Sequence, residues 1–161
     1  SRVRELSKGM VTQLHLALVM AIDAKLLVLD EPTLGLDILM RKQFYETLLN
    51  EYFDEQRTIL VTTHQVDEDE HTLTDLLFID RGRIVLDAAM DEVQEKYAQV
   101  AVRPEHVAAA RTHKPLAERQ GLGRTHMLFR DANRAELERL GEVGVPSVAD
   151  LFVATIQGAR A

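Results

Sequence analysis

The chain is 161 residues long, with 46% hydrophobic residues and a formal net charge of −7. That length and apolar content suffice for one folded domain, or for a domain with a small appendage. The acidic balance argues against a nucleic-acid-binding protein, which needs clustered Lys and Arg. The absence of cysteine excludes disulfides and thiolate metal sites and is consistent with a cytoplasmic protein.

The first elements alternate between helix and strand. Ser7 to Ala24 is apolar on most sides and predicts a helix that is largely buried. Leu26 to Asp30 is a short apolar run that ends in acids, which is typical of a buried parallel strand. Asp37 to Asn50 is amphipathic and predicts a second helix. Three of its side chains are expected to face inward: Leu39, Phe44 and Leu48.

The pattern continues with a β-branched strand at Thr58 to Thr63 and a short helix at Val66 to Leu73, whose first turn is acidic. Two strands then flank the Arg81-Gly82 turn, at Leu76 to Asp80 and Arg83 to Leu86. Strands that alternate with helices predict an α/β fold with a mainly parallel sheet and flanking helices.

The remaining residues have a different charge and a different pattern. Residues 1–95 hold nine Lys/Arg and nineteen Asp/Glu, whereas residues 96–161 hold ten and seven. This shift predicts two domains, 1–95 and 96–161. The second is expected to be a small α+β appendage. Its predicted elements are a strand at Tyr97–Arg103, a helix from Pro104, a hairpin of Leu116–Gln120 with Arg124–Arg130, a helix at Arg134–Leu140 and a last helix capped by Ser147.

Two acids follow the first predicted strand. Asp30 and Glu31 would stand at the carboxyl edge of a parallel sheet, where α/β proteins bind their ligands. Nucleotide hydrolysis needs a hard oxygen ligand for Mg²⁺ and a group that orients or deprotonates the attacking water. Asp30 suits the first role and Glu31 the second. A solvated strand end would explain the same two residues.

Two further segments bear on this site. Pro32 to Asp37 reads Pro-Thr-Leu-Gly-Leu-Asp, which is also an ordinary turn leading to an N-capping Asp37. His64 follows Thr62 and Thr63 at the end of the second predicted strand, where it could sense a phosphate.

The segment Leu6-Ser7-Lys8-Gly9-Met10 precedes the first helix. A Ser and a Gly at a helix N-terminus present a hydroxyl and backbone N–H groups to a phosphate, although a plain helix cap would look the same.

In this order, the segments resemble the ATP-binding subunits of the ABC (ATP-binding cassette) family. Leu6 to Met10 resembles the signature, usually LSGGQ, and departs from it at Lys8 and Met10. Asp30-Glu31 resembles the Walker B motif with its catalytic glutamate, Pro32 to Asp37 the D-loop, and His64 the H-loop histidine. Pro146 to Phe152 resembles the P-S-x-x-D-L-F tail of ABC-2-type export ATPases.

The resemblance implies a partial P-loop NTPase sheet and an ATPase that uses ATP and Mg²⁺. Asp30 would hold Mg²⁺ through water, and Glu31 and His64 would be catalytic. Ser7, Gly9 and Asp37 would contact the ATP of a second, opposite ATPase subunit. The other implied partner is an integral membrane permease, which places the protein in the cytoplasm at the inner face of the cell membrane.

No G-x-x-x-x-G-K-[ST] phosphate loop occurs in the 161 residues. We therefore expect a C-terminal portion of such an ATPase, inactive by itself, whose strands at 58–63 and 76–80 lack a shared neighbour and favour dimerisation or rearrangement.

Three functions are compatible with these residues: an exporter subunit, which the tail favours, a soluble ABC ATPase that does not transport, and a non-catalytic fragment whose 96–161 part regulates or dimerises.

Overall fold

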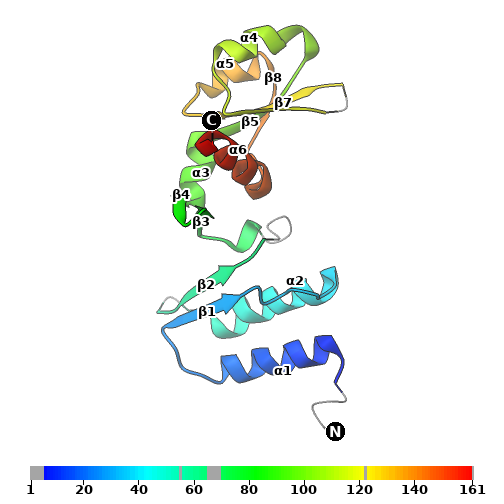
Figure 1. The fold of residues 1–161 in the computed structure, drawn as a ribbon, viewed down its shortest axis with the longest axis vertical. Coiled ribbons are helices and arrows are strands. Elements are labelled where there is room, and N and C mark those ends of the chain that lie inside the picture. Colours follow the sequence, from blue (N-terminus) through cyan, green and yellow to red (C-terminus); the bar gives the residue numbers. More distant parts are fainter. Residues whose placement is uncertain (1–5, 55, 65–69, 122, 161) are drawn as a thin grey trace. The chain divides into compact units, whose positions relative to one another are not determined.

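The computed structural model describes residues 6–54, 56–64, 70–121 and 123–160. The chain divides into two compact units, Ser1–Asp69 and Glu70–Ala161, and each is described by itself. Figure 1 shows their helices and strands. Every helix within the described residues is too short or too polar to cross a lipid bilayer.

The first unit contains a two-stranded parallel sheet with helices packed on it (Figure 1). Its strands pair in register from Leu26 opposite Thr58 to Asp30 opposite Thr62. The carboxyl ends of the two strands therefore lie side by side at one edge. The elements of this unit are α1 (Lys8–Met20), β1 (Leu26–Asp30), α2 (Ile38–Thr47), the π-helix η2 (Leu48–Tyr52) and β2 (Thr58–Thr62).

Side-chain caps fix where both α-helices begin. The Ser7 hydroxyl accepts a hydrogen bond from the Met10 N–H at 3.2 Å, and the Asp37 carboxylate accepts one from the Met40 N–H at 2.9 Å. Each cap satisfies one of the backbone donors that a helix start leaves unpaired. The predicted helix starts are confirmed, whereas α1 ends at Met20, before the predicted Ala24.

The core of the first unit is small and consists of four buried side chains: Leu16, Phe44, Leu48 and Tyr52. The prediction that α1 is largely buried is wrong, because Leu14 and Leu18 are 37% and 59% exposed. Only the face of α1 that meets α2 and the sheet is covered by described residues.

Leu39 is 75% exposed, so its predicted inward position is also wrong, while those of Phe44 and Leu48 are confirmed. Phe44 lies five positions after Leu39, which places the two side chains about 140° apart around the helix.

The second unit is an α+β structure with two antiparallel sheets. One is the hairpin β3–β4, and the other has the strand order β6-β7-β5-β8. Its elements are η3 (Glu70–Thr72), β3 (Asp75–Asp80), β4 (Arg83–Ala89), α3 (Met90–Lys96), β5 (Tyr97–Val102), η4 (Pro104–His106), α4 (Val107–Thr112), β6 (Ala117–Gln120), β7 (Thr125–Arg130), α5 (Arg134–Glu138), β8 (Gly141–Gly144) and α6 (Val148–Arg160).

The four-stranded sheet has a well-packed core on one face. Val100, Met127 and Phe129 of the sheet are at most 1% exposed and pack with Ala110 of α4 and Leu137 of α5. Strand β8 was not predictable from the sequence pattern, because Gly-Glu-Val-Gly is not a β-branched run. Its first residue must be glycine, since a Cβ on Gly141 would lie 2.2 Å from the Ala101 carbonyl oxygen.

The hairpin β3–β4 belongs to this second unit. The rings of Phe78 on β3 and Phe152 on α6 meet edge to face at 5.1 Å. The Val148 N–H at the start of α6 donates to the Glu70 carboxylate at 2.7 Å. These contacts explain why the units divide at Asp69/Glu70, whereas the charge shift predicts a join at 95/96. The functional division into 1–95 and 96–161 stays a prediction.

The helix predicted at Val66 to Leu73 lies partly outside the described residues, which resume at Glu70 with the short 3₁₀ helix η3.

Candidate functional site

The two acids stand at the carboxyl edge of the parallel sheet. Asp30 is the last residue of β1 and lies opposite Thr62, the last residue of β2. The Thr62 hydroxyl donates a hydrogen bond to Oδ1 of Asp30. This bond holds the exposed Asp30 carboxylate in one orientation, and its second oxygen has no hydrogen-bond partner in the part of the chain that the structure describes.

Glu31 has a left-handed backbone, with φ at 45°. Such a conformation is uncommon for a residue with a Cβ and costs roughly 1–3 kcal/mol. Its N–H donates to the Thr62 carbonyl at 3.0 Å, which extends the strand pairing by one bond. The turn aims the Glu31 side chain away from the path that a straight strand would give it.

Glu31 and His64 are in direct contact. Nδ1 of His64 lies 2.7 Å from Oε1 of Glu31, and the side chains are 63% and 31% exposed. A carboxylate only accepts hydrogen bonds, so the proton of this contact belongs to Nδ1 of the imidazole. Among the described residues, Nε2 of His64 and the second oxygen of Glu31 have no other partner, so both can meet a ligand or a water.

The loop after Glu31 is a tight double turn. Leu34 N–H donates to the Glu31 carbonyl at 3.1 Å, and Leu36 N–H donates to the Thr33 carbonyl at 3.0 Å. Gly35 has φ at 80°, a conformation that glycine adopts without strain. Thr33 is 3% exposed and anchors the loop. The loop delivers Asp37 to the N-cap of α2.

The predicted site residues form two groups. Asp30, Glu31 and His64 lie together at the sheet edge, whereas Ser7 and Gly9 lie at the start of α1. A Cβ on Gly9 would lie 3.5 Å from Cε of Met40, so the start of α1 is close to the first turn of α2, which Asp37 caps. Within the described residues, no hydrogen bond or ion pair joins the two groups.

Thr62 is the residue that the sequence analysis passed over. It was noted only as a neighbour of His64, yet it supplies the hydroxyl that orients Asp30 and the carbonyl that fixes Glu31. Its position opposite Asp30 in a parallel pair is the signal that could have identified it.

The donor set at this edge fits Mg²⁺ held largely by water and phosphate. Asp30 offers one carboxylate oxygen that Thr62 does not bond. A magnesium site of this kind uses one or two such carboxylate ligands. Among the described residues, no three His, Cys, Asp or Glu side chains gather into a group that could enclose a metal ion. The ion would therefore need ligands from outside this protein surface.

Comparison with known proteins relates this geometry to a family. Residues 2–68 match a family profile described as "AAA domain, putative AbiEii toxin, Type IV TA system". The chain is 43% identical over 84 residues to the Nod factor export ATP-binding protein I of Neorhizobium galegae. The matched residues cover 52% of this chain and 24% of that protein.

Two further relatives have the same kind of description. The chain is 30% identical over 99 residues to the ABC transporter ATP-binding protein YtrB of Bacillus subtilis (strain 168), covering 62% of this chain and 34% of that one. It is 34% identical over 89 residues to the energy-coupling factor transporter ATP-binding protein EcfA2 of Ligilactobacillus salivarius (strain UCC118), covering 55% and 31%.

These relatives are ABC transporter ATP-binding proteins, and the chain is similar to them over 84 to 99 residues. The chain spans about a quarter to a third of the length of these curated relatives. The parallel pair β1–β2 with its flanking helices is the part of a P-loop NTPase sheet that the ABC resemblance predicted, and an α+β unit follows it.

Proposed function

We propose that this chain supplies the catalytic edge of a nucleotide site in the ATP-binding subunit of an ABC transporter. The observation that supports this most directly is the contact between Glu31 and His64, 2.7 Å apart, beside the Asp30–Thr62 hydrogen bond at the carboxyl ends of two parallel strands. A solvated strand end needs none of these contacts. Together they orient three polar side chains toward one edge.

Each residue at this edge has a proposed role in ATP hydrolysis. Asp30 holds Mg²⁺ through water, and the Thr62 hydroxyl keeps its carboxylate turned to the site. The free oxygen of Glu31 orients the attacking water and accepts its proton. Nε2 of His64 faces the γ-phosphate, while Nδ1 remains on Glu31. Bound Mg²⁺ would neutralise the charge that develops on the phosphate oxygens.

The Glu31–His64 contact also links the two roles. A phosphate that contacts Nε2 would hold the His64 ring from the side opposite to Nδ1, which contacts Glu31. A phosphate at Nε2 would therefore strengthen the contact at Nδ1 and fix Glu31 in place. Hydrolysis would then depend on correct placement of the phosphate.

Ser7, Gly9 and Asp37 are proposed to serve a second copy of the subunit. Ser7 and Gly9 stand at the N-terminus of α1, a 13-residue helix whose positive dipole end attracts phosphate. Asp37 begins α2 close by, as the Gly9–Met40 approach indicates. Each chain would thus contribute one group to its own ATP and the other group to its partner's ATP.

We propose a membrane permease as the protein that this ATPase drives, and export as the direction of transport. The names of the relatives support a transporter, and one of them is a Nod factor export protein. The sequence from Pro146 to Phe152, which resembles the tail of export ATPases, also favours export. Such a subunit would work at the inner face of the cell membrane, held there by the permease.

The 161-residue chain has no phosphate-loop sequence, so we expect it to bind ATP weakly and to hydrolyse it negligibly by itself. Phosphoryl transfer depends on positioning, and the backbone cradle and lysine that hold the phosphates in P-loop enzymes are missing from these residues. Hydrolysis by this chain at the rate of a complete family member would contradict the proposal.

The test of the catalytic role is Glu31→Gln in the protein as its gene encodes it, with permease present. We expect MgATP to bind with unchanged affinity and steady-state hydrolysis to fall about a hundredfold or more, because the variant lacks the proton acceptor. Glu46→Gln is the matched control, since Glu46 is an exposed glutamate paired with Lys42 on α2. Retained hydrolysis in Glu31→Gln would assign the catalytic role to another residue.

A further inference from the structure

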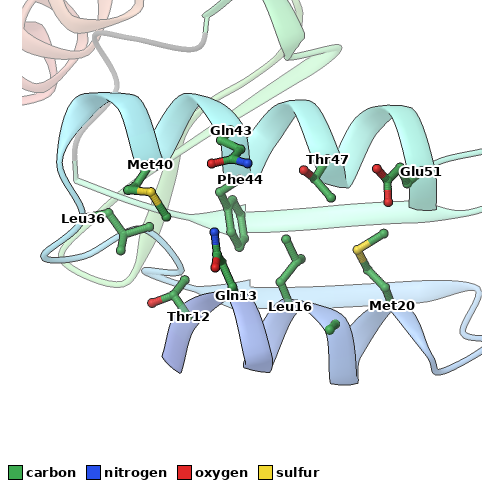
Figure 2. A pocket seen from close by; sticks show the side chains of 11 residues that line it. Thr12, Gln13, Leu16, Met20, Leu36, Met40, Gln43, Phe44, Thr47 and Glu51 are labelled. Carbon is green, nitrogen blue, oxygen red and sulfur yellow. The ribbon is translucent and has the colours of Figure 1, made fainter. Parts of the chain in front are cut away.

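A cavity of about 270 Å³ lies between α1 and α2 in the first unit, away from the sheet edge that holds Asp30 and Glu31. Figure 2 shows side chains from the two facing helices pointing into it, with Leu36 of the preceding loop at one end. At roughly 30 Å³ for each liquid water molecule, the volume equals about nine waters. It is therefore large enough for a small organic molecule of roughly ten non-hydrogen atoms.

The floor of the cavity is apolar and adaptable. Leu16 and Phe44 form its buried part, at 9% and 7% exposed. Met20 and Met40 flank them, and the flexible thioether chain of methionine adjusts its shape to what it contacts. Such a surface favours the apolar body of a ligand rather than a chain of ordered waters.

The rim is polar and includes a carboxylate. The amides of Gln13 and Gln43 lie midway along the cavity, and Glu51 lies at the end beside Met20 (Figure 2). Within the described part of the chain, these three side chains make no hydrogen bond or ion pair. All three residues are exposed, so the two amides can also be hydrated. The Glu51 carboxylate attracts a cation and repels an anion.

We propose that this cavity binds a small amphipathic organic cation. Its apolar body would lie against Leu16 and Phe44, its ammonium or guanidinium group against Glu51, and a hydrogen-bonding atom against an amide of the rim. Residues 1–69, the first unit, hold twelve Asp/Glu and seven Lys/Arg, and this excess adds a long-range attraction for the same charge.

The position of the cavity gives such a ligand a regulatory role, which rests on the proposed function. The cavity is lined by α1, which begins at Ser7 and Gly9, and by Leu36, the residue before Asp37. A ligand between the helices would change the close approach of Gly9 to Met40, which is 3.5 Å from the position of a Cβ on Gly9. It would thereby move the group that we assign to the opposite subunit's ATP.

Binding is tested on the 161-residue chain without nucleotide, by amide chemical shifts in a titration with 4-phenylbutylammonium. The controls are 4-phenylbutanol, which is neutral, and 4-phenylbutyrate, which is an anion. We expect saturable shifts at Gln13, Phe44 and Glu51 with the cation. The alcohol should bind about two- to fivefold more weakly, as for an exposed ion pair, and the anion more weakly still.

Two variants locate the site. Glu51→Gln should lower the affinity for the cation to that for the alcohol. Glu46→Gln removes the same charge outside the cavity lining and should leave the affinity for the cation unchanged. Ala17→Phe places a ring in the cavity from an exposed position of α1. This variant should abolish binding of both the cation and the alcohol.

Equal affinity for all three probes, unchanged affinity in Glu51→Gln, or shifts that map to other residues would overturn the proposal. Because no nucleotide is present, these results would leave the proposed ATPase function intact. Loss of that function is seen separately, in the Glu31→Gln experiment.

Discussion

At the scale of single residues, Asp37 combines a structural and a proposed functional role. Its carboxylate accepts the Met40 N–H at 2.9 Å and so caps α2, yet it also ends the loop that resembles the D-loop. The cap alone would explain an Asp at this position. The two roles differ in what they require, because an amide oxygen caps a helix as well as a carboxylate does.

Substitution of Asp37 separates its structural role as a helix cap from its proposed role in the partner's site. Asp37→Ala should destabilise the first unit by about 1 kcal/mol, because it removes the cap, whereas Asp37→Asn should keep the stability. Amide hydrogen exchange in α2 measures this loss. If Asp37→Asn keeps the exchange protection but lowers ATP turnover in the complete protein, the carboxylate serves the partner's site. Full turnover in Asp37→Asn would reduce the residue to a helix cap.

At the scale of elements, the set of helix residues that is buried differs from the set that the sequence pattern predicts. Leu39 and Leu48 are both leucines of the helix that was predicted from Asp37 to Asn50, but Leu48 is 1% exposed and Leu39 is 75% exposed. The helix changes to π geometry at Leu48, so that Leu48 and Tyr52 both reach the core. Burial here depends on the angle around the helix and not on residue type.

Alanine substitutions at the two leucines test this difference. Leu48→Ala should cost about 2–5 kcal/mol, because it leaves a cavity beside Phe44 and Tyr52. Leu39→Ala should change stability by less than about 0.5 kcal/mol. The measurement is hydrogen exchange of the α1 and α2 amides. Equal losses in the two variants would mean that Leu39 is covered in solution.

Local signals made much of the fold and the site predictable. Ser7, Asp37 and Ser147 each cap the helix that follows, because capping depends on three or four neighbouring residues. The acids after β1 were predictable for a similar reason. The exposure of α1, strand β8 and the role of Thr62 were missed, because each depends on what a distant segment brings near it.

At the scale of the whole molecule, the chain consists of two units with different amounts of core. The second contains a four-stranded sheet with Val100, Met127 and Leu137 fully buried. The first has a two-stranded sheet whose residues Leu26 and Val28 are 57% and 56% exposed. Exposed apolar residues on a strand favour association. Association through the strands at 58–63 and 76–80, which the sequence predicts on other grounds, stays a prediction.

The place of the boundary between the units can be tested with isolated pieces. Residues 70–161 retain both the Phe78–Phe152 ring contact and the Glu70 carboxylate that accepts the Val148 N–H, whereas residues 96–161 lose both. We expect 70–161 to unfold cooperatively in urea, and 96–161 to unfold at a clearly lower midpoint or to lack a transition, because α6 has then lost β4 as well.

Glu70→Ala within 70–161 is the intermediate case. It removes the acceptor at the start of α6 but keeps the aromatic contact, so its midpoint should lie between those of the two pieces, at a cost of about 1 kcal/mol. Equal midpoints for 70–161 and 96–161 would show instead that the charge shift near residue 95 marks a true folding boundary. The hairpin β3–β4 would then be an attachment to the second unit and not a part of its core.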